Sequence, residues 1–239
     1  MRVLLLLLLT SIVVSAQTKA PVVVELFTSE GCSDCPPADQ LLMQLDQRQP
    51  VSGANIVVLG EHVDYWDGLG WHDRFSSAQF TKRQEAYANR FRISGPYTPE
   101  MVVNGREEFV GSDGARAVTA IEKAATKTAA PVIELSHAGD RVHVVAGNAG
   151  SRRMDVIFAI TENGLSTHVG GGENHGRDLH HTAVVRRLSR IGVTRNGRFA
   201  ADVPLRLDSS WNRNNLRAVV FLQNGEAGEI VSAAELPLK

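Results

Sequence analysis

The two cysteines of the chain are the residues whose type and spacing most clearly indicate chemistry. They lie in Cys32-Ser33-Asp34-Cys35, and a separation of three residues puts both sulfur atoms on one side of a single turn, close enough to bond. The pair follows a short apolar, β-branched run and precedes an amphipathic segment, so it lies at a predicted strand-to-helix junction. This placement is typical of a redox site, because the start of a helix favours the thiolate that attacks a disulfide.

The position of each cysteine in the turn predicts its role. Cys32, at the exposed mouth of the turn, would attack a substrate disulfide, and Cys35, further into the helix, would resolve the mixed disulfide. Two alternatives stay open. One is a static disulfide, although closing so short a loop stabilises a fold by only about 2 kcal/mol or less. The other is a metal-binding pair, although the sequence has no further cysteine to complete such a site.

Several neighbours of the cysteines argue against a strongly acidic thiol. Pro36 disfavours helical angles in the residue before it, so we expect extended geometry at Cys35 and a helix that begins at Pro36. Glu30 and Asp34 flank Cys32, and nearby negative charge disfavours a thiolate unless both carboxylates point into water. We therefore expect a less acidic nucleophile than a strongly oxidising enzyme would use.

The segment Tyr97-Thr98-Pro99 directly precedes a predicted strand and supports the redox interpretation. A cis peptide bond before Pro99 would turn the backbone of Thr98 towards the sulfur of Cys32, where it could pair with an incoming peptide. The alternative is a trans bond that only starts an edge strand.

Two loops supply further candidates. The segment Val63–Phe75 is dense in aromatic and acidic residues that could shape a binding surface, and the candidate substrate-binding residues are Tyr65, Trp66 and Tyr97. Alternatively, the tryptophans cap the core and the carboxylates cap the next helix. A second loop contains His168, His175, His180 and His181, with Glu173 and Asp178. Their spacing matches no zinc or copper site, so we expect no metal and no cofactor.

The elements that must position these residues divide at residue 130. Residues 17–130 alternate between predicted strands and predicted helices. We predict strands at 22–27 and 55–60, a helix with its apolar face at 38–45, a helix at 76–92, a hairpin at 101–110 around Asn104-Gly105, and a helix at 113–126. A β-α-β unit followed by a β-β-α unit is the order of thioredoxin, so we predict an α/β thioredoxin-like N-terminal domain.

Residues 131–239 have a different pattern, in which short strands recur between turn signals. The predicted strands are 132–136, 141–146, 155–161, 182–191, 199–205, 216–222 and 229–233. Seven short strands without a helix indicate an all-β antiparallel sandwich as the C-terminal domain.

The N-terminal residues and the composition place the chain among exported proteins. Residues 1–16 have the charged, apolar and small-residue order of a secretory signal peptide, cleaved after Ala16. The alternative, a membrane anchor, would need ~20 apolar residues. We therefore expect a periplasmic or secreted protein without a stable membrane span after cleavage. The 239 residues have a formal net charge of -1, with 25 Lys+Arg and 26 Asp+Glu, so bulk charge does not steer the protein towards nucleic acid.

Several stretches of the sequence resemble a family of exported bacterial proteins catalogued as domain-of-unknown-function family 1223. They are residues 25–39, 62–67, 97–105, 172–180 and 184–186. The resemblance implies a thioredoxin-like domain with an appended β domain, in a family without an assigned reaction. His72 and Arg74 depart from the family pattern, and this departure affects only their own loop.

We therefore predict an exported thiol–disulfide oxidoreductase-like protein that acts on a protein thiol or disulfide client or redox partner. Cys32, Cys35, Thr98 and Pro99 would form its catalytic site. The alternative is a non-catalytic binding or envelope-assembly protein of the same predicted fold, in which the disulfide is structural. Sequence alone predicts neither the direction of exchange, nor the client, nor the oligomeric state.

Overall fold

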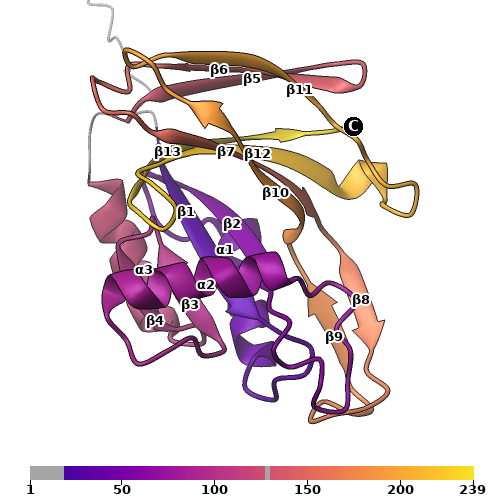
Figure 1. Ribbon diagram of the computed structural model, residues 1–239. Coiled ribbons are helices and arrows are strands. Elements are labelled where there is room, and N and C mark those ends of the chain that lie inside the picture. Colours follow the sequence, from indigo (N-terminus) through magenta and orange to yellow (C-terminus); the bar gives the residue numbers. More distant parts are fainter. Residues whose placement is uncertain (1–18, 127–129) are drawn as a thin grey trace, which may run out of the picture.

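The structure is a computed structural model that describes residues 19–126 and 130–239 (Figure 1). The predicted signal peptide, residues 1–16, lies outside the described residues. The helices are α1 (Pro36–Arg48), α2 (Ala78–Phe91) and α3 (Gly114–Ala125), with a short 3-10 helix η1 (Arg213–Asn215). The strands before residue 130 are β1 (Ala20–Thr28), β2 (Ala54–His62), β3 (Glu100–Val103) and β4 (Glu107–Val110). Those after it are β5 (Val132–Ala138), β6 (Arg141–Gly147), β7 (Asp155–Glu162), β8 (Leu165–His168), β9 (Asp178–His181), β10 (Val184–Val193), β11 (Phe199–Pro204), β12 (Leu216–Gln223) and β13 (Ile230–Pro237).

The local predictions for the first half are confirmed, and two of them have a clear chemical cause. Ser77 caps α2, because its side-chain oxygen accepts a hydrogen bond from the N–H of Gln79 at 3.2 Å. The hairpin between β3 and β4 turns at Asn104 and Gly105, whose φ angles of 48° and 59° are those of a type I′ turn. The seven strands predicted after residue 130 also form.

The predicted fold class is wrong, because strands of both halves form one sheet. Eight strands run in the order β13-β12-β7-β10-β2-β1-β3-β4, and β10 lies parallel to β2, with Val184 opposite Gly60. The Gly60 N–H donates to the C=O of Ala183 at 2.9 Å. A Cβ on Gly60 would lie 3.1 Å from the Thr182 carbonyl oxygen, so the absence of a side chain permits this close approach. A thioredoxin-like domain followed by a separate all-β sandwich is therefore not the fold of this chain. Where the chain divides into domains stays a prediction.

The hydrophobic cores also combine the two halves. α2 packs on Val23, Phe27 and Val57 of β1 and β2 together with Ile157 of β7 and Phe221 of β12. The other face of β7 and β12 packs against the small sheet β11-β6-β5. α1 and α3 cover a third cluster on β1, β2 and β3. One core therefore depends on residues from both halves of the sequence.

The ends of β1 and β2 define the end of the molecule where the candidate residues gather. The two strands are parallel, so the cysteine turn after β1 and the loop 63–75 after β2 emerge at the same edge of the sheet. β8 and β9 form a separate two-stranded hairpin between β7 and β10, and sequence analysis did not predict it. Figure 1 shows this hairpin at the lower right, extending from β10 towards the same end.

Candidate functional site

Cys32 and Cys35 form a disulfide between β1 and α1, with their Cα atoms 5.4 Å apart. α1 begins at Pro36, as predicted, and Cys35 is its N-cap. The predicted extended geometry of Cys35 is wrong, because its φ of -77° and ψ of -36° are helical. Its C=O accepts the N–H groups of Ala38 at 2.9 Å and Asp39 at 3.0 Å, and these two bonds offset the preference that the following proline imposes.

The disulfide is buried directly beneath the protein surface. Cys32 is 1% exposed and Cys35 is 0% exposed, so the predicted position of Cys32 at an exposed mouth of the turn is wrong. Ser33 and Asp34, between them, are exposed. Another part of the chain must therefore cover the sulfur atoms.

Residues 169–177, which join β8 to β9 and which we call the cover loop, attach to the cysteine turn. Asn174 is fully buried in it. Its side-chain Nδ2 donates hydrogen bonds to the C=O of Glu30 at 2.9 Å and to the C=O of Cys32 at 2.8 Å. One side chain thus connects the cover loop to the main chain on both sides of Gly31.

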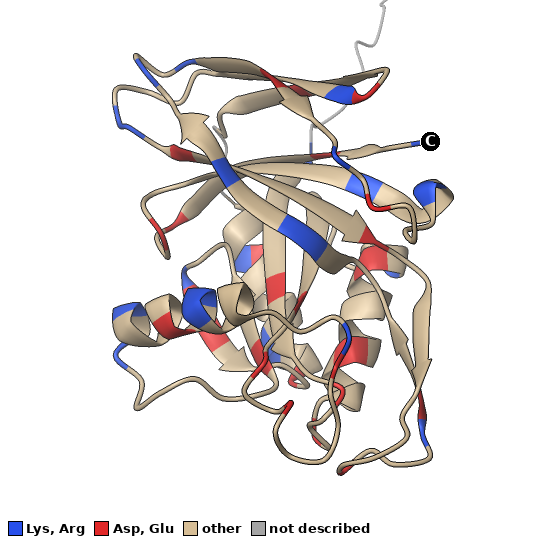
Figure 2. Ribbon diagram, turned by 45° about the vertical axis from the view of Figure 1, so that its right-hand side comes forward, with Lys and Arg blue, Asp and Glu red and all other residues tan. Residues whose placement is uncertain are grey.

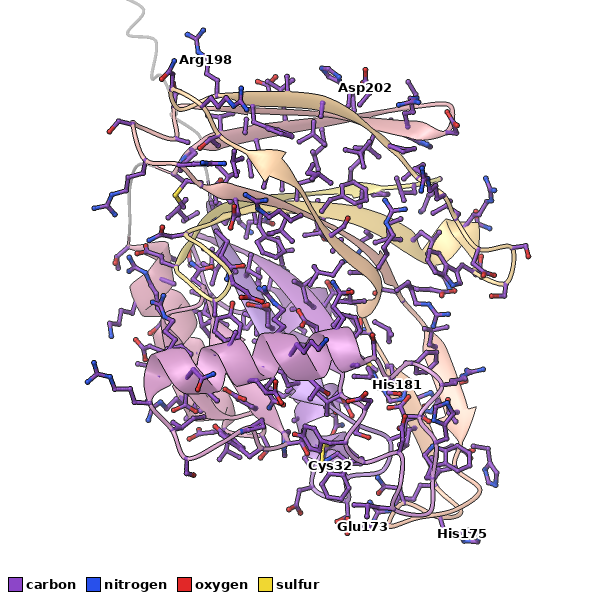
Figure 3. The ribbon with its side chains drawn as sticks, viewed as in Figure 1. Cys32, Glu173, His175, His181, Arg198 and Asp202 are labelled. Carbon is purple, nitrogen blue, oxygen red and sulfur yellow. A yellow bond between two sulfur atoms is a disulfide. The ribbon has the colours of Figure 1, made fainter. Side chains whose placement is uncertain are left out.

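Glu173 makes the second attachment of the cover loop. Its Oε2 accepts hydrogen bonds from the hydroxyl of Ser33 at 2.7 Å and from the Ser33 N–H at 3.0 Å. These bonds, first the one from the side chain, lower the pKa of Glu173, so its carboxylate is charged at neutral pH. Figure 3 shows Glu173 and Cys32 at the same end of the molecule, with His175 at the tip of the hairpin.

Consecutive glycines seat the base of the cover loop against Trp71. A Cβ on Gly172 would lie 3.1 Å from the Cβ of Trp71, and one on Gly171 would lie 2.4 Å from the carbonyl oxygen of Gly70. Because no larger residue fits at Gly171 without displacement, the glycines of this segment serve close packing.

The peptide bond between Thr98 and Pro99 is cis, which confirms the prediction. Trp66 lies between this bend and the cysteine turn. Its Nε1 donates to the hydroxyl of Thr98 at 2.8 Å, and a Cβ on Gly31 would lie 3.1 Å from the Cβ of Trp66. The structure therefore brings Thr98, Pro99 and Trp66 to the neighbourhood of Cys32, while their roles stay predictions.

The two candidate tyrosines are engaged at their hydroxyl groups. Tyr97 donates to Glu108 Oε2 at 2.6 Å, and Tyr65 donates to Gln84 Oε1 at 3.2 Å. Gln84 in turn donates to the C=O of Tyr97 at 2.6 Å. The phenols thus order the segment before the cis bond, and substrate binding by either tyrosine stays a prediction.

A buried group of histidines and carboxylates lies behind the cysteine turn. His62 Nδ1 pairs with Asp73 Oδ2 at 2.6 Å, and Asp73 also accepts the N–H of Glu30 at 2.9 Å. Glu30 pairs with His181 Nε2 at 3.2 Å and accepts the indole N–H of Trp71 at 2.9 Å. Of the two acids expected to weaken a thiolate, only Asp34 reaches water, because Glu30 is fully buried.

Opposing effects set the pKa values of two carboxyls in this group. Burial raises the pKa of Asp73, but the neighbouring His62 and the hydrogen bonds that Asp73 accepts have the larger combined effect. The pKa is therefore lowered from 3.8 to about 2. Burial likewise raises the pKa of Glu30, but the hydrogen bonds from His181, Thr167 and Trp71 together outweigh burial, so the pKa is lowered. Both groups are therefore carboxylates at neutral pH, fixed behind the cysteine turn.

Asp39 lies one helical turn after Cys35 and has the opposite character. Burial raises its pKa from 3.8 to about 7, although the charge of His181 acts against this rise. Asp73 and Glu30 add to the rise, because their negative charges disfavour a further carboxylate. Asp39 can therefore hold or release a proton near neutral pH.

Negative charge predominates around the site. Figure 2 shows more Asp and Glu than Lys and Arg positions on the loops at this end, whereas β10 carries a row of arginines. This charge disfavours a thiolate, and the weakly acidic nucleophile stays a prediction.

Sequence analysis missed Asp39, His62 and Asp73, as well as the covering role of residues 169–177. The family resemblance was an available signal for most of them, because its matching stretches 25–39, 62–67 and 172–180 contain Asp39, His62 and part of the cover loop. The histidines of the hairpin do not converge: His168 pairs with Asp178 at the surface. Within residues 19–126 and 130–239, no group of three or more His, Cys, Asp or Glu side chains could hold a metal ion.

Comparisons place the chain among other proteins. A family model described as "Protein of unknown function (DUF1223)" matches residues 23–223. No curated protein matches the chain significantly. The crystal structure of an Agrobacterium tumefaciens protein is similar, with 29% sequence identity and a TM-score of 0.78 over 94% of this chain and 97% of that one. HBP35 of Porphyromonas gingivalis has a TM-score of 0.59 at 16% identity, over 92% and 76% of the two chains, and so shows the fold alone.

In the described part of the chain, no helix is long and apolar enough to cross a membrane.

Proposed function

The chain belongs to the family of proteins of unknown function DUF1223, and from this premise we propose that it is an exported thiol–disulfide exchange protein. Its reactive group is the Cys32–Cys35 disulfide, and its client is a protein thiol or disulfide. The observation that carries the proposal is the position of this disulfide: it lies at the start of α1, next to the exposed residues Ser33 and Asp34, and Trp66 connects its turn to Thr98.

The exchange step follows from the two sulfur atoms. A client thiolate attacks Sγ of Cys32, the bond between Cys32 and Cys35 breaks, and a mixed disulfide forms while Cys35 leaves as a thiolate. A second client thiolate then attacks the client sulfur of the mixed disulfide and releases Cys32. The client loses two electrons and the cysteine pair gains them. In the reverse direction, the reduced pair transfers two electrons to a client disulfide.

We assign to Asp39 the role of an acid–base group near the disulfide. It lies on α1, one helical turn after Cys35, and with a pKa of about 7 it is partly protonated at neutral pH. An acid in this position would let the Cys35 thiolate take up a proton that does not have to enter from water.

A second function is favoured by one observation. Because both cysteines are buried and Cys32 is held by Asn174, the disulfide could be structural, in a non-catalytic binding or envelope-assembly protein. The two functions differ in what Cys32 does when Cys35 is replaced.

Trapping with a peptide disulfide distinguishes them. In Cys35→Ser, Cys32 is expected to form a mixed disulfide with a small cystine-containing peptide, detected by mass spectrometry, faster than the same variant unfolded in urea. Cys32→Ser is the matched control, in which Cys35 stays unmodified while folded. Reaction of folded Cys35→Ser no faster than that of the unfolded chain, both with Glu173 in place and with Glu173→Ala added, would leave only the structural function.

A further inference from the structure

We infer that the cover loop is an autoinhibitory element that occupies the surface a client must reach, so that exchange proceeds only while residues 169–177 are displaced. This inference rests on the proposed function. It assigns a regulatory role to Glu173 and Asn174, which follow the cysteine turn by more than 130 residues in the sequence.

Asn174 makes buried hydrogen bonds to the main chain of the cysteine turn. Its amide donates to two main-chain carbonyls of the cysteine turn, on Glu30 and Cys32, and it is fully buried in doing so. Each of these hydrogen bonds contributes about 1 kcal/mol net relative to bonds with water, so Asn174 favours the covered state. In that state Cys32 is 1% exposed.

The contacts of Glu173 add a charged attachment at the exposed side. Its carboxylate holds both the N–H and the hydroxyl of Ser33, the residue that follows Cys32. Hydrogen bonds to a charged group are the stronger kind. Since Glu173 and Ser33 are exposed, water can replace these bonds when the loop opens, and the attachment is reversible.

The strand pairing does not connect the hairpin that carries the cover loop to the large sheet. β8 and β9 pair only with each other in their own two-stranded sheet, whereas β7 and β10 on either side pair within the large sheet. Local opening of such a unit costs less than global unfolding. The reactivity of the disulfide is then set by the fraction of molecules in which the cover loop is open.

The test measures how fast dithiothreitol reduces the Cys32–Cys35 disulfide in the folded protein, with thiols trapped by a maleimide and counted by mass spectrometry. Glu173→Ala and Asn174→Asp each remove attachments of the cover loop, and each is expected to be reduced about tenfold faster than wild type. Gly171→Ala provides a second route, because its Cβ would meet the carbonyl oxygen of Gly70 at 2.4 Å and lift the loop without changing a polar contact. Circular dichroism verifies that each variant is folded.

Asp178→Ala is the matched control. It removes the surface pair with His168 on the same hairpin and no contact with the cysteine turn, so its reduction rate is expected to stay within about twofold of wild type. Equal rates in all variants and wild type would overturn the inference. Equal acceleration by Asp178→Ala would overturn it as well, because general loosening of the hairpin would then explain the effect.

The outcome for the proposed function is separate. If the uncovered variants are reduced faster by dithiothreitol but Cys32 in the double variant Cys35→Ser/Glu173→Ala still forms no mixed disulfide with the peptide, the cover exists and the exchange function fails. If the mixed disulfide forms equally fast with and without Glu173, exchange stands and the autoinhibition fails.

Discussion

Asn174 donates a hydrogen bond of 2.8 Å to the carbonyl oxygen of Cys32, across 142 residues of sequence. This bond connects a loop of the second half of the chain to the reactive turn of the first half. Cys32 itself is buried although Ser33 and Asp34 after it are exposed, so residues distant in sequence contact the reactive turn.

The pH dependence of stability should reveal the buried Asp39. With a pKa raised from 3.8 to about 7, the folded protein keeps a proton that the unfolded chain releases, so this group lowers stability as pH rises from about 4 to about 7. Asp39→Asn removes the effect. Urea unfolding at pH 4 and pH 8 should show that the free energy of unfolding of the variant, relative to wild type, rises by about 4 kcal/mol between the two. Asp34→Asn, exposed in the same region, should show no such change, and parallel curves for Asp39→Asn and wild type would refute the assignment.

The buried pair of His62 and Asp73 should be far more important for stability than an exposed pair of the same type. His62→Ala leaves the carboxylate of Asp73 buried without its partner, which should cost about 3–5 kcal/mol in chemical denaturation at pH 7. His143→Ala removes an exposed partner of Asp202, 2.8 Å away, and should cost less than about 1 kcal/mol. Similar losses in the two variants would contradict the account of the group behind the cysteine turn.

Local elements were predictable from sequence because their signals are local. The run of β1 and the Asn104-Gly105 turn each contain the side chains that determine their own geometry. The partner of β2 was not predictable in this way, since pairing with β10 depends on Gly60 meeting the chain near Ala183. A short strand pattern indicates that a strand forms and not which strand lies beside it.

The candidate site divides in the same manner. The cysteine spacing and the proline that follows Thr98 are short motifs, and the structure places both at one end of the sheet. Nothing in the sequence distinguishes Asp39 and His62 from other residues of their type. Their chemistry depends on burial, and burial is decided by tertiary packing. The cover loop was visible only as glycines and histidines, and its hydrogen bonds to the cysteine turn have no sequence signature.

Arg83 should contribute strongly to stability, because it is a buried cation between two buried acids. It lies on α2, 2.5 Å from Glu25 and 3.6 Å from Glu61, and burial and Glu25 raise the pKa of Glu61. Arg83→Met should destabilise the protein by about 3–5 kcal/mol, and adding Glu25→Gln should restore part of that loss. Thermal unfolding of the two variants tests this, and a double variant less stable than the single one would speak against the arrangement.

The two halves of the chain should unfold together. One eight-stranded sheet joins them, and Asp46 of α1 accepts a hydrogen bond from Arg217 of β12 at 2.7 Å. Calorimetry should therefore show a single transition whose calorimetric and van't Hoff enthalpies agree. Two resolved transitions would indicate independent units despite the shared sheet.

Electron transfer between the reduced protein and a peptide disulfide tests the central claim most directly. Reduced wild type and reduced Glu173→Ala are each mixed with one equivalent of a cystine-containing peptide, and protein and peptide thiols are counted over time. We predict that Cys32 and Cys35 lose their thiols together as the peptide gains two, faster than in the urea-unfolded chain, and fastest in Glu173→Ala. If neither folded protein exceeds the rate of the unfolded chain, the disulfide is structural and the exchange function is contradicted.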